Sequence, residues 1–429
     1  MRAKPFSGKA KKIQLQERKH RKQDKSNDST DVEDEIRPDK QHLASLAQKD
    51  RLVSQWEHSG VKDRVNYREN PAYVNPLPKI EGAVVDIQEF YKSTNIPIPI
   101  RPNWTYSMSK GELESREERY FKQWLESVLV LDNHEAGHLG FFEQNLEVWR
   151  QLWRVVEISD ILVIVADIRF PILHLPVSLY DYITAAMKKP LVLALTKCDL
   201  VEASTVESWV KTLQQQFPAI RVVPLSIFNL EEIGEEHKPK RYEDATGIKE
   251  LLAACDELFP GNKNLLTIGM IGHPNVGKSS LVNALAGKAV VSASKTPGHT
   301  KHFQTIFLSH EHVLPSGRYI KLCDSPGIIF PMLVPKHLQI LNGLYNVAQV
   351  RDPFGALLEA AKLVNLPRIL KLDLPPDETD WSILNVCEAY AVKRGFLTAK
   401  AARPDVSRSA NFLLRMILDG QILIHWIST

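Results

Sequence analysis

The hydrophobic positions of the chain follow two alternating patterns. Continuous apolar runs at 161–167 and 190–199 are typical of parallel strands that helices cover on both faces. Further runs with strand character lie at 220–226, 265–272, 302–309 and 319–327. Stretches with helical spacing separate most of these runs. The alternation predicts a doubly wound α/β domain with a mainly parallel sheet of six strands.

Helical patterns flank this domain on both sides. Ser109 and Glu112 have the spacing of a capping box and predict a helix over 109–131, which a second amphipathic helix over 141–159 follows. Residues 40–100 are polar and rich in proline, which predicts irregular structure packed against a neighbour. From about residue 335 the pattern is mostly helical. The predicted parts are an arm at 1–40, an extended and helical region at 41–150, the α/β domain at 151–332 and a helical domain at 333–429.

Charge changes the picture at the N-terminus. The net charge is only +3, yet residues 1–25 hold ten Lys and Arg against two acidic residues, and an acidic run follows. Such a segment cannot bury enough apolar surface to fold alone, so we predict that the basic arm is disordered. Lys/Arg blocks this dense favour polyanions, which suggests a nuclear or nucleolar address or a contact with RNA phosphates. The plainer alternative is a solubilising tail.

Composition narrows the location of the protein. No apolar run approaches the roughly 20 residues that span a bilayer, and the N-terminus is too polar for a signal peptide. The four cysteines lie far apart without metal-ligand spacing, which favours reduced thiols. We therefore expect an intracellular protein of the nucleus or nucleolus, and also of the cytoplasm, that neither is secreted nor binds a membrane.

Residues 272–279, GHPNVGKS, match the phosphate-loop pattern G-x-x-x-x-G-K-[ST] in full, with a strand before and a helix after. In such a loop the backbone N–H groups and the helix N-terminus face phosphates. Lys278 can neutralise β- and γ-phosphate oxygens, and the Ser279 hydroxyl can hold Mg²⁺. The residues expected to line the nucleotide are Gly272, Asn275, Val276, Gly277, Lys278, Ser279 and Ser280.

A second phosphate motif, Asp324-Ser-Pro-Gly327, ends the last strand-like run. Asp324 can join the Mg²⁺ shell, and the Gly327 amide can approach a γ-phosphate because no side chain stands in the way. The polar loop 294–302 between the two motifs is expected to carry a magnesium-binding threonine. Thr300 is the first candidate and Thr296 the second, and a plain surface turn is the alternative.

Thr196-Lys-Cys-Asp199 has the form of a guanine-reading motif, Asn/Thr-Lys-x-Asp. A carboxylate at Asp199 can accept both the N1–H and the 2-amino group of guanine, a donor pair that adenine lacks. The stem of Lys197 can lie along the base plane, and Thr196 takes the place of the usual asparagine. Ser226 and the Ile227 amide are predicted near the guanine O6, on a weaker pattern.

The base motif precedes the phosphate motifs, which reverses the usual order. In this respect the chain resembles the circularly permuted GTPases of the YlqF/YawG type, over nearly its whole length. Asp167 and Arg169 in ADIRFP stand for the Asp-Ala-Arg-x-Pro signature of that family. The resemblance implies an α/β P-loop GTPase domain in permuted order with a helical C-terminal extension. It also implies binding of GTP and GDP, hydrolysis with Mg²⁺, and work in ribosome-subunit assembly.

Catalysis is expected to differ from that of ordinary GTPases. Ile328 stands where a glutamine would orient the attacking water, so intrinsic hydrolysis should be slow. The resemblance implies that Asn275 could help to hold a monovalent cation such as K⁺. His273, His299 and His302 are candidate water-positioners, although we expect each at the surface. The predicted catalytic residues are Lys278, Thr300 and Gly327, and the predicted metal ligands are Ser279, Thr300 and Asp324.

Two further patterns in the sequence are less specific than these motifs. His134-Glu-Ala-Gly-His138 spells a zinc-protease motif, but a glycine punctuates it and no third ligand follows. The basic residues of the tail predict an RNA-binding face or a merely solvated surface: Lys393, Arg394, Lys400, Arg403, Arg408 and Arg415. The favoured function is a GTP-hydrolysing switch with an RNA or pre-ribosomal partner. The alternatives are a GTP-binding scaffold and an RNA-binding assembly protein, both with negligible hydrolysis.

Overall fold

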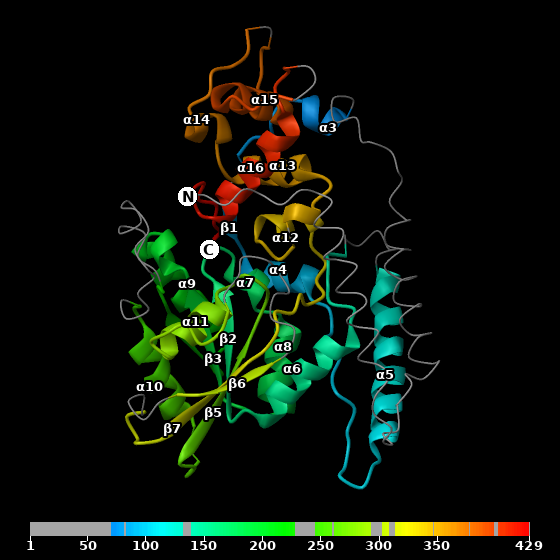
Figure 1. Cartoon of the computed structure of the whole chain (residues 1–429), viewed down its shortest axis with the longest axis vertical. Helices are drawn as coiled ribbons and strands as arrows, with labels where there is room; N and C mark the ends of the chain where they lie inside the picture. The colour runs from blue at the N-terminus through cyan, green and yellow to red at the C-terminus, as the bar shows by residue number, and fades with distance from the viewer. Residues whose placement is uncertain are drawn as a thin grey trace, which may run out of the picture. The chain divides into compact units, whose positions relative to one another are not determined.

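The computed structural model contains a six-stranded sheet in the order β4-β3-β2-β5-β7-β6, which lies in the lower half of the view in Figure 1. The model describes residues 70–80, 83–131, 139–227, 245–259, 261–292, 303–308, 314–345, 347–376, 378–398 and 402–428. All neighbouring strands are parallel except β6, which runs antiparallel to β7 at one edge. The strands are β2 (Ile161–Asp167), β3 (Leu191–Thr196), β4 (Ile220–Pro224), β5 (Leu265–Ile271), β6 (Gln304–Phe307) and β7 (Tyr319–Asp324). The predicted mainly parallel sheet of six strands is confirmed.

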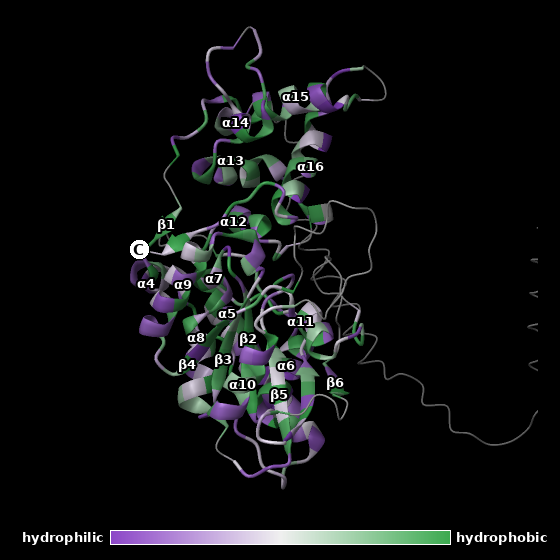
Figure 2. Ribbon diagram, turned by 90° about the vertical axis from the view of Figure 1, so that its left-hand side faces the viewer, coloured by the Kyte–Doolittle hydropathy of each residue, from purple (hydrophilic) through white to green (hydrophobic). Residues whose placement is uncertain are grey.

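Helices cover both faces of the sheet, because successive side chains of a strand point to opposite sides. Leu162 and Ile164 of β2 belong to one hydrophobic core, whereas Ile161 and Val163 belong to the other. Every residue of β2 is buried, as its unbroken apolar run predicted, and Figure 2 shows the hydrophobic strands enclosed by helices. The first core includes α6 (Leu146–Ile158) and α9 (Ala203–Gln216), and the second includes α10 (Ile248–Leu258) and α11 (Lys278–Leu285).

The strand order explains how a permuted chain builds one site. β2 lies between β3, which ends in the base motif, and β5, which ends in the phosphate loop. The two motifs are therefore separated by a single strand. In register, Asp167 is opposite Thr196, and Ile164 is opposite Ile271. Because parallel strands end at the same edge of the sheet, the two motifs meet there whichever comes first along the chain. The predicted circular permutation is confirmed.

The region before the sheet holds more regular structure than predicted. The stretch expected to be irregular contains α3 (Pro71–Val74), β1 (Val84–Val85) and α4 (Ile87–Thr94), and the Asp86 side chain caps α4. The capping box of Ser109 and Glu112 is present at the start of α5 (Lys110–Val130), as predicted. The next predicted helix begins at Leu146 rather than at 141, because the Asn145 side chain accepts from the Glu147 amide and caps it there.

The region after the sheet is mostly helical, as predicted. It comprises α12 (Lys336–Leu341), α13 (Pro353–Leu363), α14 (Leu366–Leu370), α15 (Ile383–Arg394) and α16 (Val406–Leu418). The last strand, β8 (Ile427–Ser428), pairs in parallel with β1, so the C-terminal segment returns to the N-terminal one. Shorter elements are α7 (Pro171–His174), α8 (Val177–Asp181), the π-helix Tyr182–Ala186 and the 3-10 helices Cys198–Leu200 and Val347–Gln349.

The described residues, all of which lie between 70 and 428, form one compact unit. The predicted boundaries near 150 and 332 fall inside this unit and stay predictions. The predicted basic arm at 1–40 lies outside the described residues. Among the helices that the structure describes, none has the length and apolar character needed to cross a bilayer.

Candidate functional site

The phosphate loop joins β5 to α11 through backbone conformations that its glycines allow. Gly272 has φ +146°, and a β-carbon there would lie 2.6 Å from the carbonyl oxygen of Val165. Asn275 and Gly277 also have positive φ, at +59° and +102°. The amide of Leu281 makes the first helical bond, to the carbonyl of Gly277, so the amides before it lie at the open N-terminus of α11. This arrangement suits an anion.

Lys278, the first residue of α11, is held against the loop. Its ammonium donates to the carbonyls of Gly272 at 3.1 Å and His273 at 2.6 Å. Burial lowers the pKa of Lys278 to about 8, while the charge of Asp324 acts to raise it. The second phosphate motif comes equally close, since a β-carbon on Gly327 would lie 3.2 Å from the Lys278 ammonium. Lys278 and Gly327 therefore lie together beside the loop.

Ser279 and Asp324 provide the oxygen atoms that Mg²⁺ prefers. The Ser279 hydroxyl donates to Oδ2 of Asp324 across 3.4 Å, and Oδ1 is buried without a partner among the described residues. Burial raises the pKa of Asp324 to about 6, against the lowering effects of Lys278 and Ser279. A buried carboxylate with an unsatisfied oxygen next to a hydroxyl fits a small divalent cation.

The guanine motif is joined to the phosphate loop by its first two residues. The buried Thr196 hydroxyl donates to the carbonyl of Val276 at 2.6 Å and to that of Ala166 at 3.1 Å. The ammonium of Lys197 donates to the carbonyl of Asn275 at 2.9 Å. Thr196 thus supports the phosphate loop at the Val276 carbonyl, as an asparagine amide could, and Lys197 supports it at the Asn275 carbonyl.

Asp199 lies in the 3-10 turn that follows Lys197, half-buried. Burial raises the pKa of Asp199, while the hydroxyl of Ser226 acts to lower it. The amide of Cys198 donates to the carbonyl of Leu225, and this bond holds the next residue, Ser226, close to the guanine motif. The predicted base-reading residues therefore come together. The side chain of Ile227 lies in the second hydrophobic core, and the other predicted loop residues, Val276 and Ser280, lie in or next to the phosphate loop.

One prediction about the site is wrong. His273 was expected at the surface, but its side chain is fully buried beneath the phosphate loop. Its ring packs against Phe330 and His174, with centroids 5.1 and 5.5 Å away. Burial lowers the pKa of His273 well below its usual range. The second position of the loop points back into the core, so this ring belongs to the packing. Thr296, His299, Thr300, His302 and the residues 134–138 lie outside the described residues.

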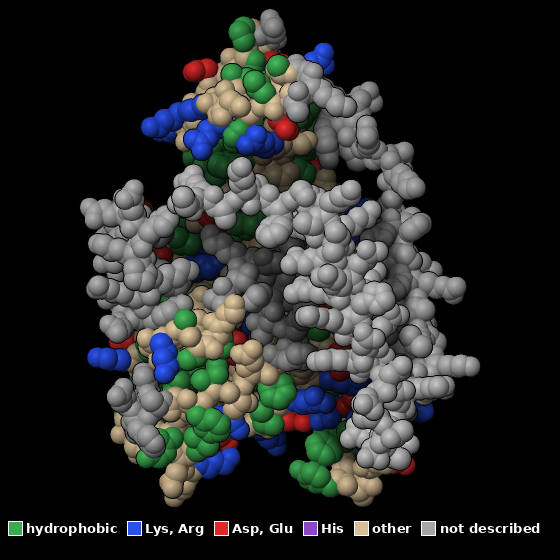
Figure 3. Space-filling view, in the orientation of Figure 1, with side chains coloured by type: hydrophobic (Ala, Val, Ile, Leu, Met, Phe, Trp, Pro, Cys, Tyr) green, Lys and Arg blue, Asp and Glu red, His purple; other side chains and the backbone are tan. Residues whose placement is uncertain are grey.

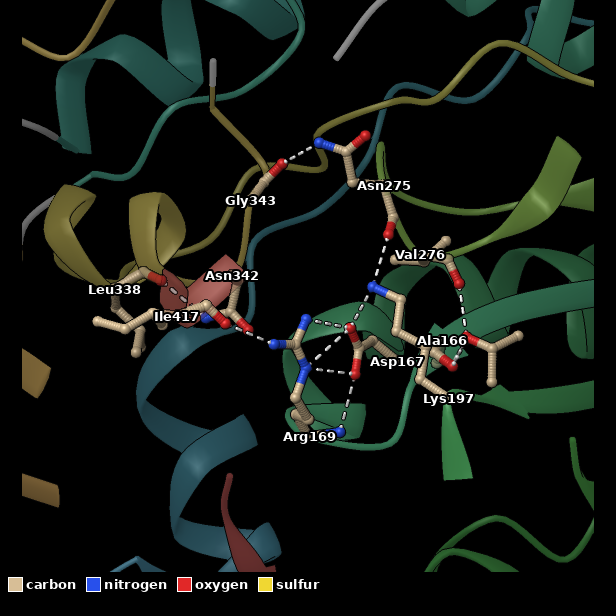
Figure 4. Close-up of polar contacts among 11 residues, drawn as sticks. Ala166, Asp167, Arg169, Lys197, Asn275, Val276, Leu338, Asn342, Gly343 and Ile417 are labelled. Carbon is tan, nitrogen blue, oxygen red and sulfur yellow. Dashed lines mark hydrogen bonds and ion pairs between the residues drawn. The ribbon is translucent and has the colours of Figure 1, made fainter. Parts of the chain in front are cut away.

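Sequence reasoning assigned no role to the residues that surround Lys197. Asp167, at the carboxyl end of β2, accepts from Lys197 and from Arg169, and both Asp167 and Arg169 are 2% exposed (Figure 4). The signal was available, because two opposite charges directly after an apolar strand must pair when they are buried. Gly343 was not predictable, since its carbonyl meets the Asn275 amide, at 2.8 Å, only through the fold.

The fold and these motifs define a P-loop GTPase with its base-reading and phosphate-binding halves in exchanged order. Comparisons with known proteins agree with this class. A family model described as 50S ribosome-binding GTPase matches residues 267–367. Guanine nucleotide-binding protein-like 1 from Rattus norvegicus is 36% identical over 435 residues, which cover 84% of this chain and 70% of the relative. Large subunit GTPase 1 from Saccharomyces cerevisiae is 32% identical over 371 residues, covering 76% of this chain and 57% of that protein.

The solved structure of GNP-bound YlqF from T. maritima is 21% identical and has a TM-score of 0.42, covering 66% of this chain and 97% of that chain. The identity to guanine nucleotide-binding protein-like 1 from Rattus norvegicus, and the share of both chains that it covers, show the family of this chain. The chain belongs to the guanine nucleotide-binding protein-like 1 family of circularly permuted GTPases.

Proposed function

We propose that the protein binds GTP at the carboxyl edge of the sheet, hydrolyses it with Mg²⁺, and changes its contacts with a ribonucleoprotein partner as it does so. One observation carries this proposal: Lys278, Gly327 and the Ser279–Asp324 pair converge on the phosphate loop. The base-reading loop is fastened to the same loop by Lys197. One site can therefore contact both ends of a guanine nucleotide.

In this proposal each residue has a separate task. Lys278 neutralises the β- and γ-phosphate oxygens, and the Gly327 amide contacts the γ-phosphate. Ser279 and Asp324 would hold Mg²⁺, whose positive charge would offset the negative charge that develops on the phosphate oxygens. Thr300, the third proposed ligand, lies outside the described residues. Asp199 accepts the two donors of guanine, with Ser226 and the Ile227 amide beside the base.

We propose that hydrolysis by the isolated protein is slow. Ile328 is 1% exposed and its side chain lies in the first hydrophobic core, with its amide on the carbonyl of Gly272. A side chain in this place neither reaches nor polarises an attacking water, so a partner or a cation must complete the site. The side-chain oxygen of Asn275 is suited to K⁺. The side-chain nitrogen of Asn275 already donates to the Gly343 carbonyl, which leaves the oxygen as the acceptor.

The proposed partner is pre-ribosomal RNA or its protein complex. The names of the matched family and of the yeast relative support a ribosomal partner. Figure 3 shows Lys and Arg side chains on the surface of the C-terminal helices. Arg394 and Arg408 are exposed there and lie over the rings of Phe412 and Phe396, an arrangement that can also meet bases and phosphates. The nucleolus, nucleus and cytoplasm remain the proposed locations.

A single comparison tests the nucleotide site. The wild type and Lys278→Ala are titrated with fluorescent GDP and GTP, and single-turnover hydrolysis is followed with and without a pre-ribosomal fraction and with K⁺ or Na⁺. The proposal requires guanine-nucleotide binding that Lys278→Ala weakens, and hydrolysis that the added fraction or K⁺ accelerates. Binding without any hydrolysis under all conditions would indicate a GTP-binding scaffold instead.

A further inference from the structure

Asp167 is the centre of a buried group of charges at the carboxyl end of β2. Its two oxygens accept from the guanidinium of Arg169 at 2.8 to 3.2 Å, and Oδ1 also accepts from the Arg169 amide at 3.0 Å. Burial alone would raise the pKa of Asp167, but the charges of Arg169 and Lys197 hold this pKa well below its usual range. The carboxylate is therefore ionised and fixed in one orientation by Arg169.

That orientation determines where Lys197 lies. Oδ2 of Asp167 accepts from the Lys197 ammonium at 2.7 Å, on the side opposite the carbonyl of Asn275 at 2.9 Å. Lys197 has φ +60°, a left-handed conformation that is uncommon for a residue with a long side chain. The two contacts hold the side chain between the end of β2 and the phosphate loop. Without a fixed Asp167, this bridge would lose one of its two supports.

Arg169 also reaches the C-terminal helices. Its Nη1 donates to the carbonyl of Ile417 in the last turn of α16 at 3.1 Å, and its own carbonyl accepts from the amide of Trp426 at 2.8 Å. On the other side of the site, the side-chain amide of Asn275 donates to the carbonyl of Gly343, between α12 and α13. Figure 4 shows the resulting chain of contacts, which starts and ends in the C-terminal region and passes through Lys197 and the phosphate loop.

We propose that Arg169 is a positioning residue for guanine-nucleotide binding, which acts through Asp167 on Lys197 and couples the nucleotide site to α16. The proposal rests on the proposed nucleotide site, because it assumes that Lys197 contacts the bound base. An arginine that only neutralised Asp167 would need no contact with α16. Arg169 makes such a contact, with the Ile417 carbonyl, so the position of Lys197 depends on the packing of α16.

A partly buried arginine, Arg318, supplies the control. Arg318 donates to Asp256 at 2.8 Å and to three backbone carbonyls, including that of Gly261 at 2.7 Å. It thus combines a carboxylate with backbone carbonyls as Arg169 does. It precedes β7, at the amino edge of the sheet and away from the nucleotide site. A variant of Arg318 therefore shows how the loss of an arginine with such contacts affects the fold, without a direct effect on the nucleotide site.

The test uses full-length Arg169→Gln, which keeps the Asp167–Lys197 pair but removes the cation that orients it. Arg318→Gln is the control, and Arg169→Lys keeps the charge without the three-way contact. The affinity for N-methylanthraniloyl-GDP is measured for each, and amide hydrogen exchange of residues 406–418 is followed with and without saturating GDP. We expect Arg169→Gln to bind roughly 10-fold more weakly, as for loss of a charged hydrogen bond.

Hydrogen exchange separates positioning from simple support of the fold. In the wild type and Arg318→Gln, GDP should slow exchange in α16, whereas in Arg169→Gln and Arg169→Lys saturating GDP should leave it unchanged. A purely structural role would speed exchange equally with and without GDP. Unchanged GDP affinity, or normal protection of α16 in either variant, overturns the inference. If Arg169→Gln does not fold, Arg169→Lys decides. If the wild type binds no GDP, the proposed nucleotide site itself has failed.

Discussion

Gly327 lies against Pro274 of the phosphate loop so closely that a β-carbon on Gly327 would be 2.9 Å from the Pro274 Cα. Real β-carbons do not approach backbone atoms at that distance, so the contact requires glycine at 327. The contact holds the Asp324–Gly327 motif against the phosphate loop. A bound γ-phosphate would then meet both motifs in one geometry.

Gly327→Ala should separate the two phosphate motifs. We expect a loss of about 1–3 kcal/mol in the free energy of unfolding from overpacking. Displacement of the reacting groups should also slow single-turnover GTP hydrolysis by up to roughly 100-fold. The control is Gly111→Ala in α5, where an added β-carbon meets nothing within 4 Å. If Gly327→Ala hydrolyses GTP at the wild-type rate, Gly327 does not position the γ-phosphate.

The affinity for Mg·GTP should have an optimum between pH 6 and 8. Burial raises the pKa of Asp324 to about 6 and lowers that of Lys278 to about 8. Metal binding needs the carboxylate and phosphate binding needs the ammonium. The affinity should therefore fall as the pH drops below 6 or rises above 8, by up to about 10-fold per unit. Titration with a fluorescent GTP analogue from pH 5 to 9.5 measures both limbs. Asp324→Asn should weaken the acidic limb and move the basic limb to lower pH, because the Asp324 charge no longer raises the pKa of Lys278.

The same pKa values predict the stability of the nucleotide-free protein. The folded pKa of Asp324 lies above its ordinary value of 3.8, so the folded state holds this proton more tightly than the unfolded chain does. This contribution to stability is present at low pH and is lost as the pH rises to about 6. The lowered pKa of Lys278 acts at higher pH, where stability should increase from about pH 8 upward. Comparing urea unfolding of wild type, Asp324→Asn and Lys278→Met isolates each contribution.

Asp199→Asn should move the base preference from guanine to xanthine. The substitution exchanges an acceptor for an amide donor, which suits the additional carbonyl of xanthine and mismatches the 2-amino group of guanine. We expect GDP affinity to fall about 10- to 100-fold, the cost of a lost charged pair of hydrogen bonds. Competition of fluorescent GDP with GDP, XDP and ADP measures the change. Unaltered selectivity would show that Asp199 does not read the base.

Ile328→Gln should not restore fast hydrolysis. The Ile328 side chain lies in the first hydrophobic core, so a glutamine amide there would be buried without a water to orient. Burial of that amide should cost about 1–3 kcal/mol of unfolding free energy. Ile328→Val is the matched control, with an expected cost near 1 kcal/mol. Faster single-turnover hydrolysis in Ile328→Gln would mean that residue 328 can turn toward the nucleotide.

Much of the fold was predictable because strands buried on both faces carry a strong local pattern. Each predicted strand forms, and the capping box at Ser109 begins α5 as expected. The start of α6 was placed too early because a hydrophobic pattern continues past the residue that caps the helix, Asn145. The α4 helix was missed because its few residues lie in a proline-rich stretch, where propensity is a weak guide.

The sequence by itself determined which residues we propose to contact the base and the phosphates, because phosphate chemistry requires glycine, lysine and hydroxyl groups at fixed spacings along the chain. It also determined the permuted order of the motifs. Only the tertiary structure decided that His273 is buried and that Arg169 joins Asp167 to Ile417. The physical reason is the same in both cases. Burial and contacts with backbone carbonyls depend on which segments the fold brings together, and residue spacing carries no record of a carbonyl 248 residues away.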